Sequence, residues 1–321
     1  MRGVEDALTK QELEAEHCWE GEDRVPGRPN VTAFRQRLRL HQSRWRESKG
    51  YPIGSQPMVP KQGGPKPRPV GSRLPVDFAR ETGANFITPN ALQAVRTRTA
   101  ITEREQSFDH QRVWAELLWS PALCFNLFGD LAADIALADR AVHTWWPDTP
   151  GTVTEVRFAH SPGRLDPTYL ENLVYFNVAF VLDLRDGTKG IMAVATKYHD
   201  RYRRQPPKPK RLPRYIDVTE KSGVFHMDAL PAVNGTDLIH LWLEHMLVHS
   251  MLQHPSGEWT WGRFALVHPA GNDEFVDAAA RYRSTLVDES NFSTLTIEDL
   301  LDSDVLPKKT VSALRARYIP R

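Results

Sequence analysis

The sequence predicts an α/β fold in which helices flank one central sheet. Three consecutive segments are rich in β-branched and aromatic residues, which favour strands, and helical and strand-like segments alternate after them. The three segments are Thr152 to His160, Leu173 to Leu184 and Gly190 to His199, and the later elements are a helix at about Asp237 to Gln253, a strand at about Trp261 to His268 and a helix at about Asn272 to Val287. The order helix, three strands, helix, strand is typical of a single sheet covered by helices.

The first 75 residues differ in composition from the rest. Five arginines (Arg35, Arg37, Arg39, Arg44 and Arg46) follow Val31 in a segment that favours a helix. Either a solvated helical arm or an arm that contacts phosphates would explain them. From Tyr51 to Pro75 proline, glycine and lysine are too frequent for a helix or a central strand. We expect residues 1–75 to form a charged arm and an extended strap, and residues 76–321 to form the α/β domain.

The connections around the three strands carry their own signals. Two helices, at about Asp109 to Leu118 and Leu131 to Trp145, are expected before the strands. The turn Arg185-Asp186-Gly187-Thr188 predicts a hairpin between the second and third strands. The loop from Arg201 to Arg214 is basic and rich in proline, which suits either a solvated excursion or contact with a nucleic-acid backbone.

Bulk composition restricts the class of protein. Forty-one Lys and Arg against forty Asp and Glu give a net charge of +1, so any attraction to nucleic acid must be local. Two cysteines, Cys18 and Cys124, lie far apart, and the start of the chain lacks the apolar core of a signal peptide. No apolar run reaches the ~18 residues of a membrane span. We expect a cytoplasmic protein with no membrane partner.

The candidate site lies on the hairpin. Side chains alternate faces along a strand, so Asn177 shares a face with Asp183, and Ala195 shares a face with Lys197. An acidic residue on the first strand and an acidic-x-Lys triplet on the second would bring two carboxylates and an ammonium together. Such a group holds Mg²⁺, which activates water and neutralises phosphate charge. Here the triplet is Ala195-Thr196-Lys197, and alanine has no side-chain atom that binds metal.

Three stretches carry a resemblance to a known family: Phe158 to Arg164, Tyr175 to Phe180 and Ala193 to Asp200. Shorter matches follow at Gly83 to Phe86, Leu123 to Gly129 and Trp261 to Phe264. Together they make the chain, from about residue 30 onwards, similar to a bacterial family of restriction endonucleases in the PD-(D/E)xK nuclease superfamily.

The resemblance implies a restriction-endonuclease-like core and, in the family, Mg²⁺-dependent cleavage of DNA. The family has glutamate at the position of Ala159, aspartate at that of Asn177 and glutamate at that of Ala195, whereas Lys197 matches the catalytic lysine. The three metal-ligand positions are thus vacated, and we expect this sequence not to bind the family's Mg²⁺. DNA is the implied partner, and a homodimer is expected by analogy with enzymes that cut both strands.

Several readings of the vacated positions stay open. The chain is either a natural pseudonuclease or a nuclease silenced by introduced substitutions, and a third reading restores the metal site with nearby acids. The acids considered are Glu155, Asp166, Glu171, Asp183, Asp186 and Asp200. Asp183 lies about 20 Å along the strand from Asn177, and Glu155 about 13 Å from Ala159, so neither simply replaces a ligand. A rival from another class is a non-catalytic module that binds DNA or a protein partner, for example in phage defence.

Candidate DNA contacts flank these positions. Arg164 ends the turn Ser161-Pro162-Gly163-Arg164, which is either a plain turn or one that brings a guanidinium to a phosphate. The other candidates are His160, His199, Arg201, Arg203 and Arg204. His245 and His249 have the spacing of a helical zinc site, but no glutamate follows His245 directly, so we expect them either to serve helix packing or to lie on the surface.

Overall fold

A five-stranded mixed sheet forms the centre of the computed structural model, which describes residues 8–21, 24–59, 62–103, 108–206 and 209–320. The strands lie in the order β3 (Thr152–His160), β4 (Phe176–Asp183), β5 (Lys189–Thr196), β6 (Trp259–His268) and β7 (Phe292–Thr296). The pairs β3–β4 and β4–β5 are antiparallel, and β5–β6 and β6–β7 are parallel. The predicted α/β fold with a central sheet flanked by helices is confirmed.

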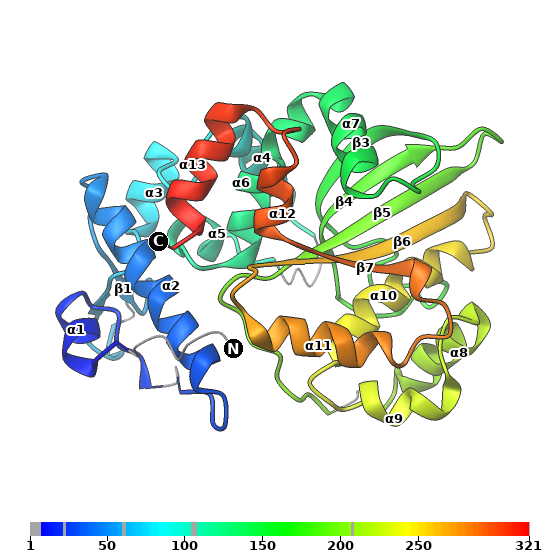
Figure 1. Cartoon of the computed structure of the whole chain (residues 1–321), viewed down its shortest axis with the longest axis horizontal. Helices are drawn as coiled ribbons and strands as arrows, with labels where there is room; N and C mark the ends of the chain where they lie inside the picture. The colour runs from blue at the N-terminus through cyan, green and yellow to red at the C-terminus, as the bar shows by residue number, and fades with distance from the viewer. Residues whose placement is uncertain (1–7, 22–23, 60–61, 104–107, 207–208, 321) are drawn as a thin grey trace.

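Helices cover both faces of the sheet (Figure 1). One face packs on α4 (Pro89–Thr99), α6 (Ser120–Ala133) and α7 (Ile135–Trp145), and the other on α8 (Leu212–Ser222), α10 (Ile239–Leu252) and α11 (Asp273–Arg283). Alternation along β4 divides its side chains between the two layers: Val178 and Phe180 belong to the first core and Ala179 and Val181 to the second. Both faces of the central strands are therefore buried.

The remaining elements complete the chain around this core. They are α1 (Lys10–Ala15), α2 (Pro29–Ser48), β1 (Gly54–Gln56), β2 (Arg68–Val70), α3 (Val76–Thr82), α5 (Arg112–Ala115), η2 (Met227–Ala229), α9 (Leu230–Val233), η3 (Glu289–Asn291), α12 (Ile297–Asp302) and α13 (Lys308–Tyr318). The short strands β1 and β2 pair with each other, apart from the central sheet. Among the described residues, no helix combines the length and the apolar character that a bilayer crossing requires.

The prediction was least accurate before the strands. The helix expected at residues 109–118 is only the single turn α5, and α7 starts at Ile135 rather than near Leu131. The intervening helix α6 was missed. Every residue of α6 from Ser120 to Leu131 is buried, so its sequence has no polar face that would reveal a helical period.

Helix α2 is not a solvated arm, and that interpretation was wrong. Arg35 and Arg39 are 8% and 1% exposed, and the helix packs against α11 and α13. Gln42, also buried, donates to the backbone oxygen of Arg317 at 2.6 Å and to Tyr198 Oη at 3.1 Å. Helix α2 therefore packs on the rest of the protein, and the division of the chain at residue 75 stays a prediction.

Candidate active-site pocket

Strand register places the three predicted metal-ligand positions, 159, 177 and 195, in one row across the sheet. Phe158 pairs with Val178 and His160 with Phe176, so position 159 lies opposite position 177. Val178 pairs with Val194, and continuing this register by one residue sets Asn177 opposite Ala195. The three positions are thus neighbours on β3, β4 and β5, although they are far apart in sequence.

The side chain of Ala159 nevertheless leaves this row. Ala159 has a left-handed backbone, with φ of +46°, and it belongs to the same core layer as the preceding Phe158. Alternation therefore breaks at this residue. Arg98 of α4 donates to the backbone oxygens of both Phe158 and Ala159, at 3.1 and 3.2 Å, which holds the irregular strand end in place.

Ala159 and His160 line a cavity that we call the edge cavity. It has a volume of about 460 Å³ and lies between α4, α6 and the edge strand β3. Burial, followed by the charge of Arg157, lowers the pKa of His160 to about 4, so its imidazole is neutral at pH 7. The side chains of Ala159 and His160 therefore do not line the same cavity as those of Asn177 and Lys197.

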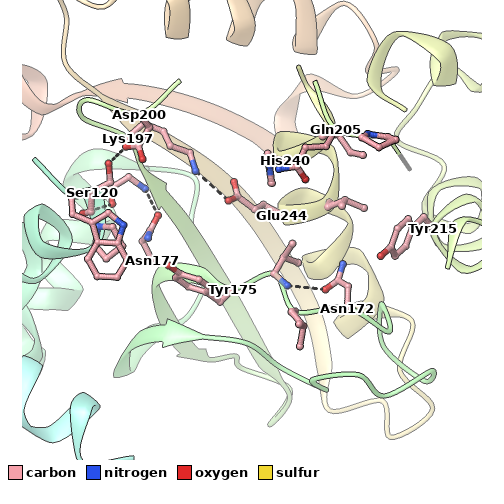
Figure 2. Close-up of a pocket in the computed structure, with 18 residues that line it drawn as sticks. Ser120, Asn172, Tyr175, Asn177, Lys197, Asp200, Gln205, Tyr215, His240 and Glu244 are labelled. Atoms are coloured by element: carbon pink, nitrogen blue, oxygen red, sulfur yellow. Dashed lines mark hydrogen bonds and ion pairs between the residues drawn. The ribbon is translucent and has the colours of Figure 1, made fainter. Parts of the chain in front are cut away.

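Asn177 and Lys197 line a cavity of about 330 Å³ that we call the lysine pocket (Figure 2). Its walls come from the start of β4, the end of β5, the start of α6, the loop before β4 and one side of α10. Besides these two residues, the lining includes Trp119, Ser120, Asn172, Tyr175, Asp200, Gln205, Tyr215, His240 and Glu244. Ala195 is 1% exposed and does not line the pocket itself.

An ion pair spans the lysine pocket. Lys197 Nζ lies 3.3 Å from Glu244 Oε1, and only 15% and 11% of the two side chains are exposed. Burial lowers the pKa of Lys197, but the charges of Glu244 and Asp200 raise it by more, so the ammonium is held protonated. The second oxygen of Glu244 is buried and has no hydrogen-bond partner within the described part of the protein.

Two further polar side chains of the pocket, Asn177 and Asp200, are engaged by the protein. Asn177 Oδ1 accepts the backbone N–H of Thr196 at 2.8 Å. Asp200 accepts hydrogen bonds from the Ser120 hydroxyl and, at 3.2 Å, from the backbone N–H of Tyr198. His240 lies one helical turn before Glu244, and burial lowers the pKa of its imidazole.

The side chains present do not fit a divalent cation. Mg²⁺ prefers several hard oxygen ligands with negative charge. Glu244 is bound to the ammonium of Lys197, and Asp200 accepts from Ser120 and Tyr198. The amide oxygen of Asn177 is occupied by Thr196, and Ala195 offers no ligand. Within the described ranges, no group of three or more His, Cys, Asp and Glu side chains is placed to hold a metal ion.

Three of the predicted DNA contacts gather in a third cavity, which we call the arginine cavity. His199, Arg201 and Arg203 line it, and it shares Trp119 and Asp200 with the lysine pocket. Arg204 is exposed and lines neither of these cavities. Arg164 lies 4.0 Å from Glu103, with 12% of its side chain exposed.

Sequence reasoning missed Glu244 and His240 as site residues. One signal was available: α10 is almost wholly buried, and Glu244 is the one carboxylate within its sequence Ile239–Leu252. A carboxylate on a buried helix requires a partner, and here the partner is Lys197. The spacing of four residues also places His240 and Glu244 on the same side of the helix.

Comparison with models of known protein families matches residues 29–320 to the PD-(D/E)XK nuclease superfamily. No curated protein and no solved structure matches the chain. The family match spans the whole sheet, both helical layers, the lysine pocket, the edge cavity and all of the arginine cavity except Glu20. Given this extent, the chain belongs to the PD-(D/E)XK nuclease superfamily.

Proposed function

We propose that this protein binds DNA through its nuclease-type fold and, with the sequence it has, does not cleave it. The carrying observation is the set of side chains at and beside the lysine pocket: an amide at position 177 of β4, an alanine at the neighbouring position 195 of β5, and a lysine paired with Glu244. PD-(D/E)XK nucleases typically use divalent metals, and the two carboxylates of this pocket, Glu244 and Asp200, are engaged by Lys197 and by Ser120 and Tyr198. The same pocket fits a natural pseudonuclease and a silenced enzyme.

Support for DNA binding comes from the neighbouring arginine cavity. Arg35, Arg73, Arg112, Arg201 and Arg203 all line it, beside a pocket where a family member would hold the scissile phosphate. Guanidinium groups are the side chains best matched to phosphate oxygens. The net charge of +1 gives no general attraction to DNA, so this local concentration of cations is the feature that favours it.

A gel-shift titration of duplex DNA without metal, at several salt concentrations, tests the binding half of the proposal. We expect binding that weakens as salt rises, because each phosphate contact releases counterions. A protein that binds no DNA even at low salt contradicts the proposal and favours a module that binds a protein partner instead.

Restoring the acids tests the second half. Asn177→Asp with Ala195→Glu, with and without Ala159→Glu, should give Mn²⁺ binding by calorimetry and nicking of plasmid DNA. The matched control is Asn177→Asp with Ala195→Gln, which keeps the added volume and omits one charge. Lys197→Met in the restored protein should abolish nicking. Cleavage by the unaltered protein, at a rate that Lys197→Met removes, would show that the metal site is not disabled.

A further inference from the structure

The arginine cavity differs from the other two in its chemistry. It has a volume of about 290 Å³, and its lining combines five arginines with three carboxylates and few apolar atoms. It lies between helix α2, the strand β1, the turn α5 and the segment that follows β5. The lysine pocket meets it at Trp119 and Asp200.

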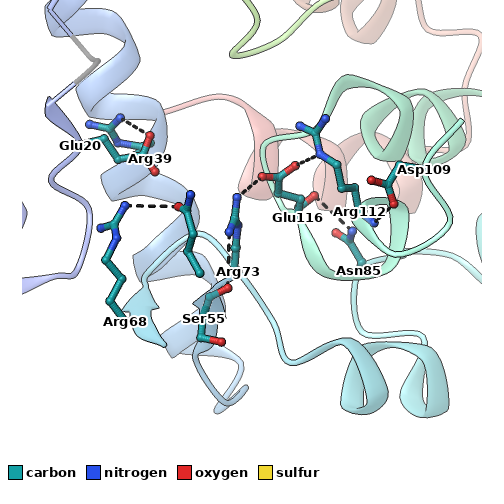
Figure 3. A network of polar contacts seen from close by, with 10 residues as sticks. Glu20, Arg39, Ser55, Arg68, Arg73, Asn85, Asp109, Arg112 and Glu116 are labelled. Carbon is teal, nitrogen blue, oxygen red and sulfur yellow. Dashed lines mark hydrogen bonds and ion pairs between the residues drawn. The ribbon is translucent and has the colours of Figure 1, made fainter. Parts of the chain in front are cut away.

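The carboxylates of this cavity are already engaged. Glu116 accepts from Arg73 and from Arg112, both at 2.5 Å, and Figure 3 shows the two guanidiniums converging on it. Glu20 pairs with Arg39 at 3.4 Å. Asp200 accepts hydrogen bonds from Ser120 and Tyr198. An incoming anion therefore meets the cationic side of the cavity without having to displace these acids.

Two buried guanidinium donors on the cationic side, Arg35 Nε and Arg201 Nε, lack partners within the described part of the protein. Arg35 is 8% exposed, and its Nη1 is fixed by the backbone oxygens of His199 and Asp200. The carboxylate of Glu274 interacts electrostatically with both arginines, but one of its oxygens accepts the backbone N–H of Tyr202 and the other forms no hydrogen bond with either Nε. A buried charged donor without an acceptor is costly, so the two arginines indicate a further acceptor.

Position and charge define what that acceptor is. Burial, followed by the nearby charge of Arg201, lowers the pKa of Arg35 to about 10, and the anion that best offsets two adjacent guanidiniums is doubly charged and rich in oxygen. The cavity is also too small for a folded macromolecular segment and large enough for a phosphate with part of a sugar.

We propose that the arginine cavity is a binding site for a phosphate monoester, held by Arg35 and Arg201 next to the lysine pocket. The monoester is supplied either by the phosphorylated end of a nucleic-acid strand or by a free nucleotide or phosphate. This site is distinct from the vacated metal positions, and it does not depend on internal phosphates of a DNA duplex being bound.

Calorimetry and thermal unfolding with inorganic phosphate, against chloride at equal ionic strength, test the site directly. We expect saturable binding and a raised Tm for the unaltered protein. Arg201→Gln should weaken phosphate binding at least tenfold. Arg185→Gln is the matched control, because this arginine of the β4–β5 turn is exposed and does not line the cavity. Arg35→Lys should also weaken binding, and Arg201→Gln carries the test if that variant fails to fold.

Two further titrations identify the source of the phosphate. Oligonucleotides with 5′-phosphate, 3′-phosphate or hydroxyl ends are compared in the unaltered protein and in Arg201→Gln, and adenosine monophosphate is titrated separately. A preference for a phosphorylated end that Arg201→Gln removes assigns the site to strand ends, and tight binding of phosphate or the nucleotide alone assigns it to a free ligand. Absence of phosphate binding, or phosphate binding that Arg201→Gln leaves intact, overturns the proposal. Binding of hydroxyl-ended DNA reports on the proposed function independently.

Discussion

Asn177, which lines the lysine pocket, accepts the backbone N–H of Thr196 through its side-chain oxygen at 2.8 Å. Thr196 is fully buried, so this N–H has no access to water. An aspartate at position 177 could accept the same bond and still offer a second oxygen to the pocket. The position therefore combines a structural hydrogen bond with the predicted place of a metal ligand.

This relationship predicts unequal effects of two substitutions at Asn177. Asn177→Leu should lower the free energy of unfolding by about 1–3 kcal/mol, since it leaves the Thr196 N–H without a partner. Asn177→Asp keeps the acceptor and should cost less. Urea denaturation of both variants measures the difference, and equal losses would show that the hydrogen bond contributes nothing.

Substitutions of Lys197 and Glu244 should have non-additive effects on the free energy of unfolding. Lys197→Met should destabilise the protein by about 3–5 kcal/mol, because it leaves the Glu244 charge buried without its partner. The double change Lys197→Met with Glu244→Leu should recover much of that loss, since both charges are then absent. Denaturant titrations of the two single variants and the double variant check this, and a double variant as weak as the sum of the singles would contradict it.

Substitution of Arg317 on α13 should strongly lower the free energy of unfolding. This fully buried guanidinium donates to the backbone and side-chain oxygens of Asn85 and lies 4.3 Å from the ring centroid of Trp45 on α2. Arg317→Met should cost about 2–4 kcal/mol in unfolding free energy through the lost charged hydrogen bonds and ring contact.

The matched control for this substitution is Arg315→Met. Arg315 pairs with Asp302 at the exposed surface, where such pairs contribute about 0–1 kcal/mol. Differential scanning calorimetry on both variants should show a much larger fall in Tm for Arg317→Met. A similar fall in the two would mean that the buried arginine does not hold α13 to the rest of the fold.

The buried imidazole of His160 should make the stability of the folded protein depend on pH. Its pKa is about 4 in the folded protein against an ordinary 6.5, so between these values the unfolded chain binds a proton that the folded protein does not. Stability should therefore rise with pH across that window and be lost as pH falls from about 6.5 to about 4, with a slope of up to about 1.4 kcal/mol per pH unit from this group.

Substituting His160→Gln should flatten that slope in denaturation measured from pH 4 to 7. His226→Gln is the control, because the His226 side chain is exposed. If His160→Gln leaves the pH profile unchanged, burial does not lower the pKa of this imidazole.

A side chain at Gly129 should destabilise the protein where α4 and α6 cross. A Cβ added there would lie 2.5 Å from the Ala91 Cα, a backbone atom that cannot rotate away. Alanine is otherwise favoured over glycine in a helix by about 1 kcal/mol. Gly129→Ala should nevertheless reduce stability by about 1–3 kcal/mol through overpacking. A gain in Tm would show that the two helices can separate at little cost.

The sequence predicted the hairpin well because its signals are local. The run of branched residues in β3, β4 and β5 and the turn at Asp186-Gly187 depend only on neighbouring positions. The expected strand Thr152 to His160 coincides with β3. Membership of the PD-(D/E)XK nuclease superfamily was likewise confirmed, since the resemblance depends on motifs spread along the chain.

The candidate site was harder to predict because it depends on distant contacts. Nothing in the residues around Ala159 indicates its left-handed backbone, which takes its side chain out of the row shared with Asn177. Arg35 looked solvated because sequence alone does not show the backbone oxygens of residues 199 and 200 that receive its donors. Glu244 was overlooked because its partner is 47 positions away.

The parallel pairing of β5 with β6 has a consequence for the order of folding. Lys197 follows β5, and Glu244 lies on α10, within the long connection that must cross the sheet before β6 can pair. Closing such a loop carries an entropic cost before any contact is gained, so this pairing forms slowly compared with the local hairpin β4–β5. An intermediate that contains only β3, β4 and β5 would hold Asn177 and Lys197 with no α10 beside them. The ion pair can therefore report the docking of α10 on the sheet in a refolding experiment.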